Sequence, residues 1–188
     1  MYAHVFKRVL DVILAAAGLA LLAPLCLLVF LAIRIFDPGP AIFRQLRVGR
    51  GGCEFAFYKF RSMPVNTGDI PSDKLADVAL SRVGKFIRRT NIDELPQLVN
   101  ILKGDMSVVG PRPPIPAQTE LVELRRRNGA LNCRPGLTGL AQVNAFDGMS
   151  VEQKAAFDGQ YAQSIGFLRD IAIIASTLLY LLKPPPKY

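Results

Sequence analysis

A long apolar run near the front of the chain constrains the fold more than any other feature. Val12–Ile33 is 22 residues long and contains no Asp, Glu, Lys, Arg or His. A straight helix of that length extends about 33 Å, close to the hydrocarbon thickness of a bilayer. The run is too long for the apolar core of a signal peptide, and no cleavage site of small residues precedes the basic segment that follows. The sequence therefore predicts a membrane segment here.

The basic residues on both sides of this segment and the proline within it are compatible with two arrangements in the membrane. Lys7 and Arg8 precede it, and four arginines follow it: Arg34, Arg44, Arg47 and Arg50. Basic residues favour the cytoplasmic face, so both ends are drawn to one side, which a spanning helix does not allow. Pro24, near the middle, lacks an N–H, so the helix should bend there. Both a re-entrant helix, which enters and leaves by one leaflet, and a spanning helix are compatible with these features.

One acidic residue lies at the edge of the apolar run. Asp11 follows Lys7 by four residues and Arg8 by three, a spacing at which helical side chains can meet. We therefore expect the charge of Asp11 to be paired with these two residues at the membrane interface.

Composition narrows the chemistry that the chain can perform. There are 23 Lys and Arg residues against 15 Asp and Glu, and the net charge of +8 indicates an anionic partner such as nucleic acid, acidic lipid or a phosphorylated substrate. His4 is the single histidine, which disfavours both Ser-His-Asp hydrolysis and zinc hydrolysis. The three cysteines are scattered without a C-x-x-C spacing, so a disulfide scaffold is also disfavoured.

Beyond the apolar run, the pattern predicts an α+β fold that is mostly helical. Two β-like segments, 41–48 and 53–60, flank Gly49–Gly52 and indicate a β-hairpin. Helical patterns cover 80–89, 93–102, 117–127 and 151–182. The apolar end of the last one, Ile171–Leu182, is too short to span a bilayer and suits an in-plane membrane helix or a core helix. We expect residues 1–36 to form the membrane anchor and 37–188 a second domain with interfacial helices.

The segment from Arg88 to Leu98 is the most informative for chemistry. Pro96 is tolerated best in a first helical turn, which predicts a helix start between Asn91 and Asp93. Asn91 and Glu94 have the spacing of a capping box, and Asp93 and Glu94 would lie at the positive end of the helix dipole. Two interpretations stay open. The carboxylates could simply cap the helix, or they could provide a nucleophile or a ligand for a hard cation.

Several cations could hold a phosphate near these carboxylates. Arg112 lies between prolines, whose fixed φ values would keep its loop stiff as a phosphate or nucleotide clamp. Arg134, in the segment Arg134–Gly139, repeats this design as a second candidate for substrate binding. Lys59 and Arg61, at the end of the second β-segment, are further candidate anion contacts. Each could instead be an ordinary surface charge or a charge guarding a strand edge.

In their order along the chain, the motifs resemble those of the bacterial sugar transferases known as small monotopic phosphoglycosyl transferases. The matching segments are KRVLD with the apolar run, FRQLRVG, YKFRSM, IDELPQLVN, LKGDMSVVGPRP and RPGLTGLAQVN. They cover nearly the whole chain, and IDELPQL and GDMSVVGPRP are the most specific.

The resemblance implies a reaction and roles for individual residues. Such enzymes transfer a phospho-sugar from a UDP-sugar to polyprenyl phosphate, usually undecaprenyl phosphate, and release UMP. Asp93 would attack the β-phosphorus and carry a covalent phospho-sugar, so that the kinetics are ping-pong. Glu94 would assist with Mg²⁺, for which Asp93 and Glu94 are the candidate ligands. Arg88 and Arg112 would bind phosphate or the nucleotide, with Lys59 near the site.

The resemblance also implies a location and partners. The enzyme would sit on the cytoplasmic face of the bacterial inner membrane, anchored by a re-entrant helix broken at Pro24, with membrane lipid and without nucleic acid as partner. The sequence does not indicate an oligomeric state. The family breaks its helix at Ser-Pro, whereas this chain has Ala23-Pro24. It also commonly has Gly-Arg-Asn where this chain has Ala145-Phe146-Asp147, so a basic residue is missing and the sugar is not identified.

Two other functions fit parts of the sequence. A basic module that binds acidic lipid or nucleic acid at the membrane surface would explain the charge and the apolar run, but it gives Asp93 and Glu94 no role beyond capping. The chain also has no Trp for base stacking. A magnesium-assisted direct transfer without a covalent intermediate would resemble polytopic transferases, for which one membrane segment is too few.

Overall fold

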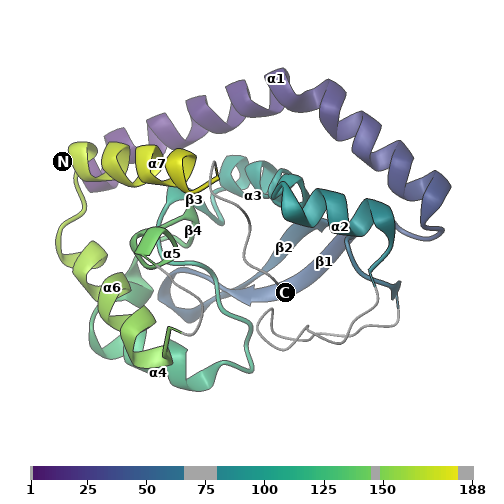
Figure 1. Ribbon diagram of the computed structural model, residues 1–188. Coiled ribbons are helices and arrows are strands. Elements are labelled where there is room, and N and C mark those ends of the chain that lie inside the picture. The colour runs from purple at the N-terminus through teal and green to yellow at the C-terminus, as the bar shows by residue number, and fades with distance from the viewer. Residues whose placement is uncertain (1, 66–79, 145–148, 182–188) are drawn as a thin grey trace.

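The computed structural model describes residues 2–65, 80–144 and 149–181 (Figure 1). It is mostly helical and carries two small two-stranded sheets in this part of the chain, which confirms the predicted α+β class. In order along the chain, the elements are η1 (Tyr2–Phe6), α1 (Lys7–Phe36), β1 (Ile42–Val48), η2 (Arg50–Gly52), β2 (Glu54–Phe60), α2 (Arg82–Arg89), η5 (Ile92–Glu94), α3 (Gln97–Lys103), β3 (Ser107–Val109), α4 (Thr119–Arg127), η6 (Ala130–Asn132), β4 (Gly136–Thr138), α5 (Leu140–Asn144), α6 (Val151–Gln163) and α7 (Phe167–Leu181).

The predicted β-hairpin is confirmed. Strands β1 and β2 pair antiparallel, with Ile42 opposite Phe60 at one end and Val48 opposite Glu54 at the other. Phe57 and Phe60 are buried, and they face α3 and α1 through the clusters described below. The hairpin therefore serves as the platform on which the helices pack.

A second sheet was not predicted. Strands β3 and β4 pair in parallel, with Ser107 opposite Gly136 and Val109 opposite Thr138. A Cβ on Gly136 would lie 2.1 Å from the backbone nitrogen of Gly110, so only glycine allows the two backbones to approach this closely. This pairing brings the segment after β3, which contains Arg112, against the segment before β4.

Helix α1 is continuous through Pro24 and arches over the rest of the protein (Figure 1). Its first half packs against β2 and α3 in a buried cluster of Ala15, Phe57, Leu98, Ile101 and Met106. Its second half packs against β2, α2 and the residue before β1 in a cluster of Val29, Ile33, Ala41, Phe60 and Ile87. Both ends of α1 thus rest on the same globular body.

Polar contacts also fix the two ends of α1. Arg8 donates to the carbonyl oxygens of Ile101 and Leu102 at the end of α3. The expected pairing of Asp11 with Lys7 and Arg8 is wrong: the buried Asp11 carboxylate accepts from the Ser107 hydroxyl and the Val108 N–H instead. This pairing is favoured because β3 brings two donors to a carboxylate from which water is excluded.

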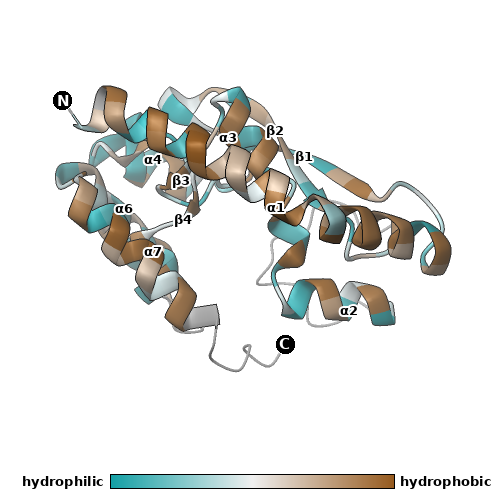
Figure 2. Cartoon of the chain, turned by 90° about the horizontal axis from the view of Figure 1, so that it is seen from above, coloured by the Kyte–Doolittle hydropathy of each residue, from teal (hydrophilic) through white to brown (hydrophobic). Residues whose placement is uncertain are grey.

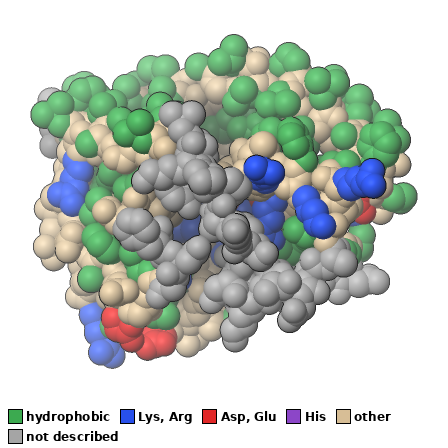
Figure 3. All heavy atoms as spheres, viewed as in Figure 1, with side chains coloured by type: hydrophobic (Ala, Val, Ile, Leu, Met, Phe, Trp, Pro, Cys, Tyr) green, Lys and Arg blue, Asp and Glu red, His purple; other side chains and the backbone are tan. Residues whose placement is uncertain are grey.

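The outer surface of α1 is hydrophobic (Figures 2 and 3). Within the described residues, α1 is the one helix long and apolar enough to cross a membrane, and only 11% of its most apolar window is buried inside the protein. Exposed apolar side chains continue onto neighbouring helices, among them Phe86 of α2, Leu102 of α3 and Leu168 of α7. Because large exposed apolar patches mark interaction surfaces, this side of the molecule is a contact surface for lipid or protein.

Most predicted helices are present with shifted bounds, but the predicted helix 151–182 is two helices. Helix α6 ends at Gln163 and α7 begins at Phe167, and the chain changes direction between them (Figure 1). Val109, Tyr161 and Ile173 form a third buried cluster that joins β3, α6 and α7. The turn is needed because only in this way can both Tyr161 and Ile173 reach one core.

Candidate active site

The carboxylates singled out in the sequence lie between two helices on the inner side of the protein. Asp93 and Glu94 belong to η5, a single 3-10 turn that connects α2 to α3. The predicted capping box is wrong, because Asn91 adopts a left-handed conformation (φ 54°) and its side chain caps nothing. Helical hydrogen bonding starts at the expected place, yet the α-helix itself begins only at Gln97, after Pro96.

Glu94 is the centre of a compact ion-pair arrangement. Lys59 Nζ lies 2.7 Å from Glu94 Oε1, and Arg112 Nη2 lies 2.6 Å from the same oxygen. Arg112 Nη1 also donates to Oε2 at 3.4 Å. Burial alone would raise the pKa of Glu94, but Arg112 and Lys59 together outweigh burial and hold the pKa below its usual range. Glu94 is therefore ionised at any physiological pH.

The Asp93 side chain is less exposed than that of Glu94, and its negative charge is less well balanced by neighbouring cations. The residue is 6% exposed, and Lys59 Nζ lies 3.5 Å from its Oδ2. Burial is the largest influence on the pKa of Asp93 and raises it, and the Glu94 charge adds to the increase, whereas Lys59 and Arg112 lower it. The net shift is upward, so Asp93 is more basic, and hence more nucleophilic once ionised, than an exposed aspartate. We call Lys59, Asp93, Glu94 and Arg112 the Asp93 cluster.

The loop that carries Arg112 is held by its backbone carbonyl oxygens. Four consecutive carbonyls accept hydrogen bonds at 2.8 to 3.1 Å: Pro111 from Gly136 N, Arg112 from Arg125 Nη1, Pro113 from Arg47 Nη1 and Pro114 from Val48 N. Prolines have no N–H, so these carbonyls are the groups through which such a loop can be fixed. The Arg112 side chain therefore extends toward Glu94 from a rigid support.

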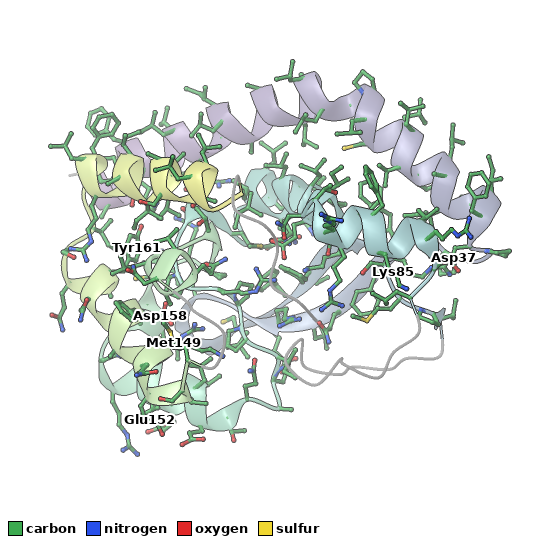
Figure 4. The ribbon with its side chains drawn as sticks, viewed as in Figure 1. Asp37, Lys85, Met149, Glu152, Asp158 and Tyr161 are labelled. Atoms are coloured by element: carbon green, nitrogen blue, oxygen red, sulfur yellow. The ribbon has the colours of Figure 1, made fainter. Side chains whose placement is uncertain are left out.

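Arg125 and Asp158 are positioning residues that the sequence analysis missed. Arg125 of α4 forms a buried ion pair with Asp158, with 2.6 Å between Nη2 and Oδ2, and the same guanidinium donates to the Arg112 carbonyl. Asp158 lies on α6 (Figure 4). The two side chains are 5% and 1% exposed. In the sequence Arg125 is the first of three consecutive arginines, and only the spacing of the buried Leu121 four residues earlier could have indicated that it faces inward.

Asn100 is a second residue that the sequence analysis missed. It is fully buried on α3, where its Oδ1 accepts from Tyr58 N and its Nδ2 donates to Ala56 O. The amide thus fastens α3 to β2, which carries Lys59. This contact sets the position of Lys59 relative to the helix that follows Asp93.

The structure places the other predicted residues as follows. Arg88 is half-buried in the last turn of α2, which leads into η5. Arg61 donates to the backbone carbonyls of Asp37 and Pro38 at the end of α1, and not to a carboxylate of the Asp93 cluster. Arg134 also lies elsewhere, because its Nε donates to Gly104 O and its side chain lines a separate cavity. Pro24 lies within α1. The departure at 145–147 lies outside the described residues.

The side chains of the site can be assessed as ligands for a divalent cation. No group of three or more His, Cys, Asp or Glu residues that could hold a metal occurs among the described residues. Asp93 and Glu94 are hard oxygen donors of the kind that Mg²⁺ prefers, and Mg²⁺ sites commonly combine one or two carboxylates with substrate phosphates. The residues present therefore fit Mg²⁺ only together with a phosphate-bearing substrate.

Gln97, which follows the Asp93 cluster in sequence, has a buried side chain. The residue is 1% exposed, and among the residues that the structure describes its Nε2 has no hydrogen-bond partner. An unsatisfied buried donor is costly, so an acceptor oxygen that reached it would be stabilised. The two carboxylates and two cations of the Asp93 cluster form a site suited to an anionic, oxygen-rich ligand.

Comparison with known proteins agrees with this arrangement. The family model of the bacterial sugar transferases matches residues 2–184. The UDP-glucose:undecaprenyl-phosphate glucose-1-phosphate transferase of Caulobacter vibrioides is 44% identical over 191 residues, which cover 97% of this chain and 72% of the relative. The enzyme of the same name from Escherichia coli is 38% identical, and the undecaprenyl-phosphate galactose phosphotransferase of Salmonella typhimurium is 35% identical.

The chain spans only 40% and 41% of the length of the latter two relatives, although they cover 93% and 97% of it. The match thus concerns one region of those longer proteins and nearly all of this chain. It favours an enzyme over a module that merely binds membranes. The chain belongs to the bacterial sugar transferase family, and it is a transferase.

Proposed function

We propose that the chain transfers a phospho-sugar from a UDP-sugar to polyprenyl phosphate, with Asp93 as nucleophile, in the initiation of a membrane-linked glycan. The observation that carries the proposal is the Asp93 cluster itself. A buried, basic carboxylate lies 3.5 Å from Lys59, beside a glutamate that is fixed by Lys59 and Arg112. Three relatives named for such transfers, to undecaprenyl phosphate from glucose or galactose donors, support the substrate class.

The proposed reaction has two displacements at one phosphorus. An Asp93 oxygen attacks the β-phosphorus of the UDP-sugar, the bond to the bridging oxygen breaks, and UMP leaves. The aspartyl phospho-sugar is then attacked by an oxygen of polyprenyl phosphate, which releases the Asp93 carboxylate and gives polyprenyl-diphosphate-sugar. Both steps need charge neutralisation and positioning more than a proton-transfer base, which suits a site without histidine.

The cations of the Asp93 cluster have defined tasks in this scheme. Lys59 and Arg112 would exchange part of their contact with Glu94 for phosphate oxygens and so screen the repulsion between Asp93 and the diphosphate. Arg88, in the helix leading into η5, would contact the nucleotide phosphate. When bound, Mg²⁺ held by Asp93, Glu94 and the diphosphate would neutralise charge on the transferring group. Gln97 Nε2 would donate to an oxygen of the ligand.

The placement of α1 supports a monotopic attachment to the membrane. Both of its ends pack on the same globular body, so the helix would enter and leave by one leaflet, and its exposed apolar residues would lie in lipid. Because UDP-sugars are cytosolic, the Asp93 cluster would face the cytoplasm. Polyprenyl phosphate would then approach from the leaflet on which the body rests.

The experiment that tests the proposal is a trapping assay. Purified protein is incubated with a panel of UDP-sugars labelled in the sugar, first without and then with undecaprenyl phosphate. We expect one UDP-sugar to release UMP in a stoichiometric burst without acceptor, with label bound to a peptide that contains Asp93, and to turn over when acceptor is added. Turnover without a labelled peptide would support direct transfer, and no UMP release from any sugar would refute the proposal.

A further inference from the structure

A second cluster of cations lies around a cavity that the proposed reaction does not use. The cavity has a volume of about 380 Å³ and is lined by residues from η1, α1, η2, β3 and α6 together with the segment before β4. Its charged lining residues are Lys7, Asp11, Arg50 and Arg134. None of the residues in the Asp93 cluster lines it.

The cavity and the Asp93 cluster take residues from opposite ends of the hairpin. Arg50 lies in the turn at one end of the hairpin, beyond the pair of Val48 and Glu54, whereas Lys59 lies near the other end. Lys59 lies five positions after Glu54, which corresponds to about 17 Å along a strand. Arg50 and Lys59 are therefore too far apart to bind one phosphate group.

The charges around the cavity are incompletely compensated. Lys7 is paired with Asp170 at 2.6 Å, and the Asp11 carboxylate accepts from Ser107 and Val108. Within the described part of the chain, neither Arg50 nor Arg134 forms an ion pair with a carboxylate.

The guanidinium groups of Arg50 and Arg134 are also held in place. Arg50 Nε donates to Asn132 O, and Arg134 Nε donates to Gly104 O. Each bond uses one nitrogen and leaves the rest of the guanidinium free to bind an anion. Burial, followed by the neighbouring charges of Arg50 and Arg8, lowers the pKa of Arg134. Asp11 opposes this shift, and the charges of Arg50 and Arg8 are a smaller influence than burial. Their repulsion of Arg134 is one that a bound anion would relieve.

We propose that this cavity is a second anion site, which binds the phosphate group of a ligand distinct from the substrates at Asp93. Guanidinium groups match phosphate oxygens in geometry, and the volume leaves room for a group attached to the phosphate. The cavity adjoins the start of α1, where Val5, Phe6 and Val9 are exposed, so the phosphate of a lipid headgroup can reach it as readily as that of a soluble compound.

Cys133 provides a reporter for occupancy because it lines the cavity, whereas Cys53 is exposed and does not line it. The full chain in neutral detergent is treated with N-ethylmaleimide, and alkylation of both residues is followed by peptide mass spectrometry. At inorganic phosphate ten times above its Kd, alkylation of Cys133 should slow about tenfold, with Cys53 unchanged. Sodium chloride at equal ionic strength should have no such effect.

Variants assign the protection to the cavity. Arg50→Gln and Arg134→Gln should each weaken phosphate protection of Cys133 about tenfold, since each removes a charged hydrogen-bond donor. Arg126→Gln, an exposed arginine on α4 that pairs with Glu123, is the matched control and should retain protection. Far-UV circular dichroism shows that the variants are folded, and the rate at Cys53 controls for the reactivity of the reagent.

Two further measurements of Cys133 protection distinguish the possible sources of the phosphate group. Protection by phosphatidylglycerol in the micelles, at a concentration where inorganic phosphate has no effect, would identify a lipid headgroup. Protection by phosphate but not by the lipid would identify a soluble compound. Absence of protection by either, or equal protection by chloride, would overturn the proposal. The wild-type chain alone decides this, and since the readout is not turnover, the result is independent of the proposed reaction.

Discussion

The Asp93 cluster and the buried pair of Arg125 and Asp158 join guanidinium to carboxylate at the same distance, 2.6 Å, but they differ in access. The Arg112 side chain is 39% exposed, whereas Arg125 is 5% exposed. The open pair can exchange partners with a ligand, and the closed pair cannot. Under the proposed mechanism, similar contacts serve chemistry in one region and hold the fold in the other. The comparison predicts that substitutions in the open region change activity and that those in the closed region change stability.

The largest effect is expected for Asp93→Asn. An amide cannot form the aspartyl phospho-sugar, so turnover should fall by a factor of about 10⁴ or more. The free energy of unfolding should change by no more than about 1 kcal/mol, because the size and shape of the side chain are kept. UMP release and chemical denaturation measure the two quantities. Asp105→Asn, which alters a partly exposed carboxylate paired with Lys103, is the control and should retain activity. An active Asp93→Asn enzyme would reduce Asp93 to a structural role.

Asp158→Asn should have the largest effect on stability. It leaves the buried Arg125 guanidinium without its counter-charge, which typically costs about 3–5 kcal/mol. Urea denaturation followed by circular dichroism measures the loss. Glu123→Gln, which removes an exposed carboxylate paired with Arg126 and Arg127, is the matched control and should cost less than about 1 kcal/mol. If both variants were equally stable, the distinction between the two regions would not hold.

Arg112→Gln is expected to show the opposite pattern. Loss of the guanidinium removes a cation that would stabilise the transferring phosphate, so kcat/KM should fall about 100-fold. Stability should change little, because the side chain is partly exposed and the Arg112 carbonyl still accepts from Arg125. Arg126→Gln serves as the control for activity. A large loss of stability with unchanged kcat/KM would place Arg112 with the closed pair.

The smallest expected effect concerns the pH dependence of kcat/KM. Asp93 must be ionised to attack, and its pKa is raised, so activity should fall as the pH decreases through that pKa. Lys59 lowers the pKa of Asp93, so Lys59→Gln should raise it further and shift the acid limb of the profile to higher pH. Lys103→Gln, on the far end of α3, should leave the limb in place. A limb that shifted to lower pH would contradict the assignment to Asp93.

Local pattern predicted much of the fold, and the failures have physical reasons. The hairpin follows from two β-rich segments around glycines, and the bounds of α2 follow from its spacing. Strands β3 and β4 are three residues each and pair across 26 intervening residues. Neither is long enough to show the alternating hydrophobic pattern by which a strand is recognised. The turn between α6 and α7 was missed because Ser164–Gly166 is a break too short to interrupt the helical pattern.

From the sequence, we could predict only those residues of the site that belong to recognisable motifs. Lys59, Asp93, Glu94 and Arg112 come together as the family resemblance implied, although they lie on three separate segments. The capping box failed because the Glu94 side chain bonds two distant cations rather than the nearby backbone. Sequence alone cannot distinguish these partners, since long-range ion pairs depend on the packing of β2 and the Arg112 loop. Arg125 and Asp158 were missed for the same reason.

The loop around Arg112 has a consequence for how the family can diverge. Its carbonyl oxygens carry the contacts that fix it, so a mutation that exchanges the side chain at position 112 leaves those contacts unchanged. Relatives that bear the names of glucose and of galactose enzymes share this region with the chain. The backbone of this loop can thus keep its course when the side chain at position 112 changes.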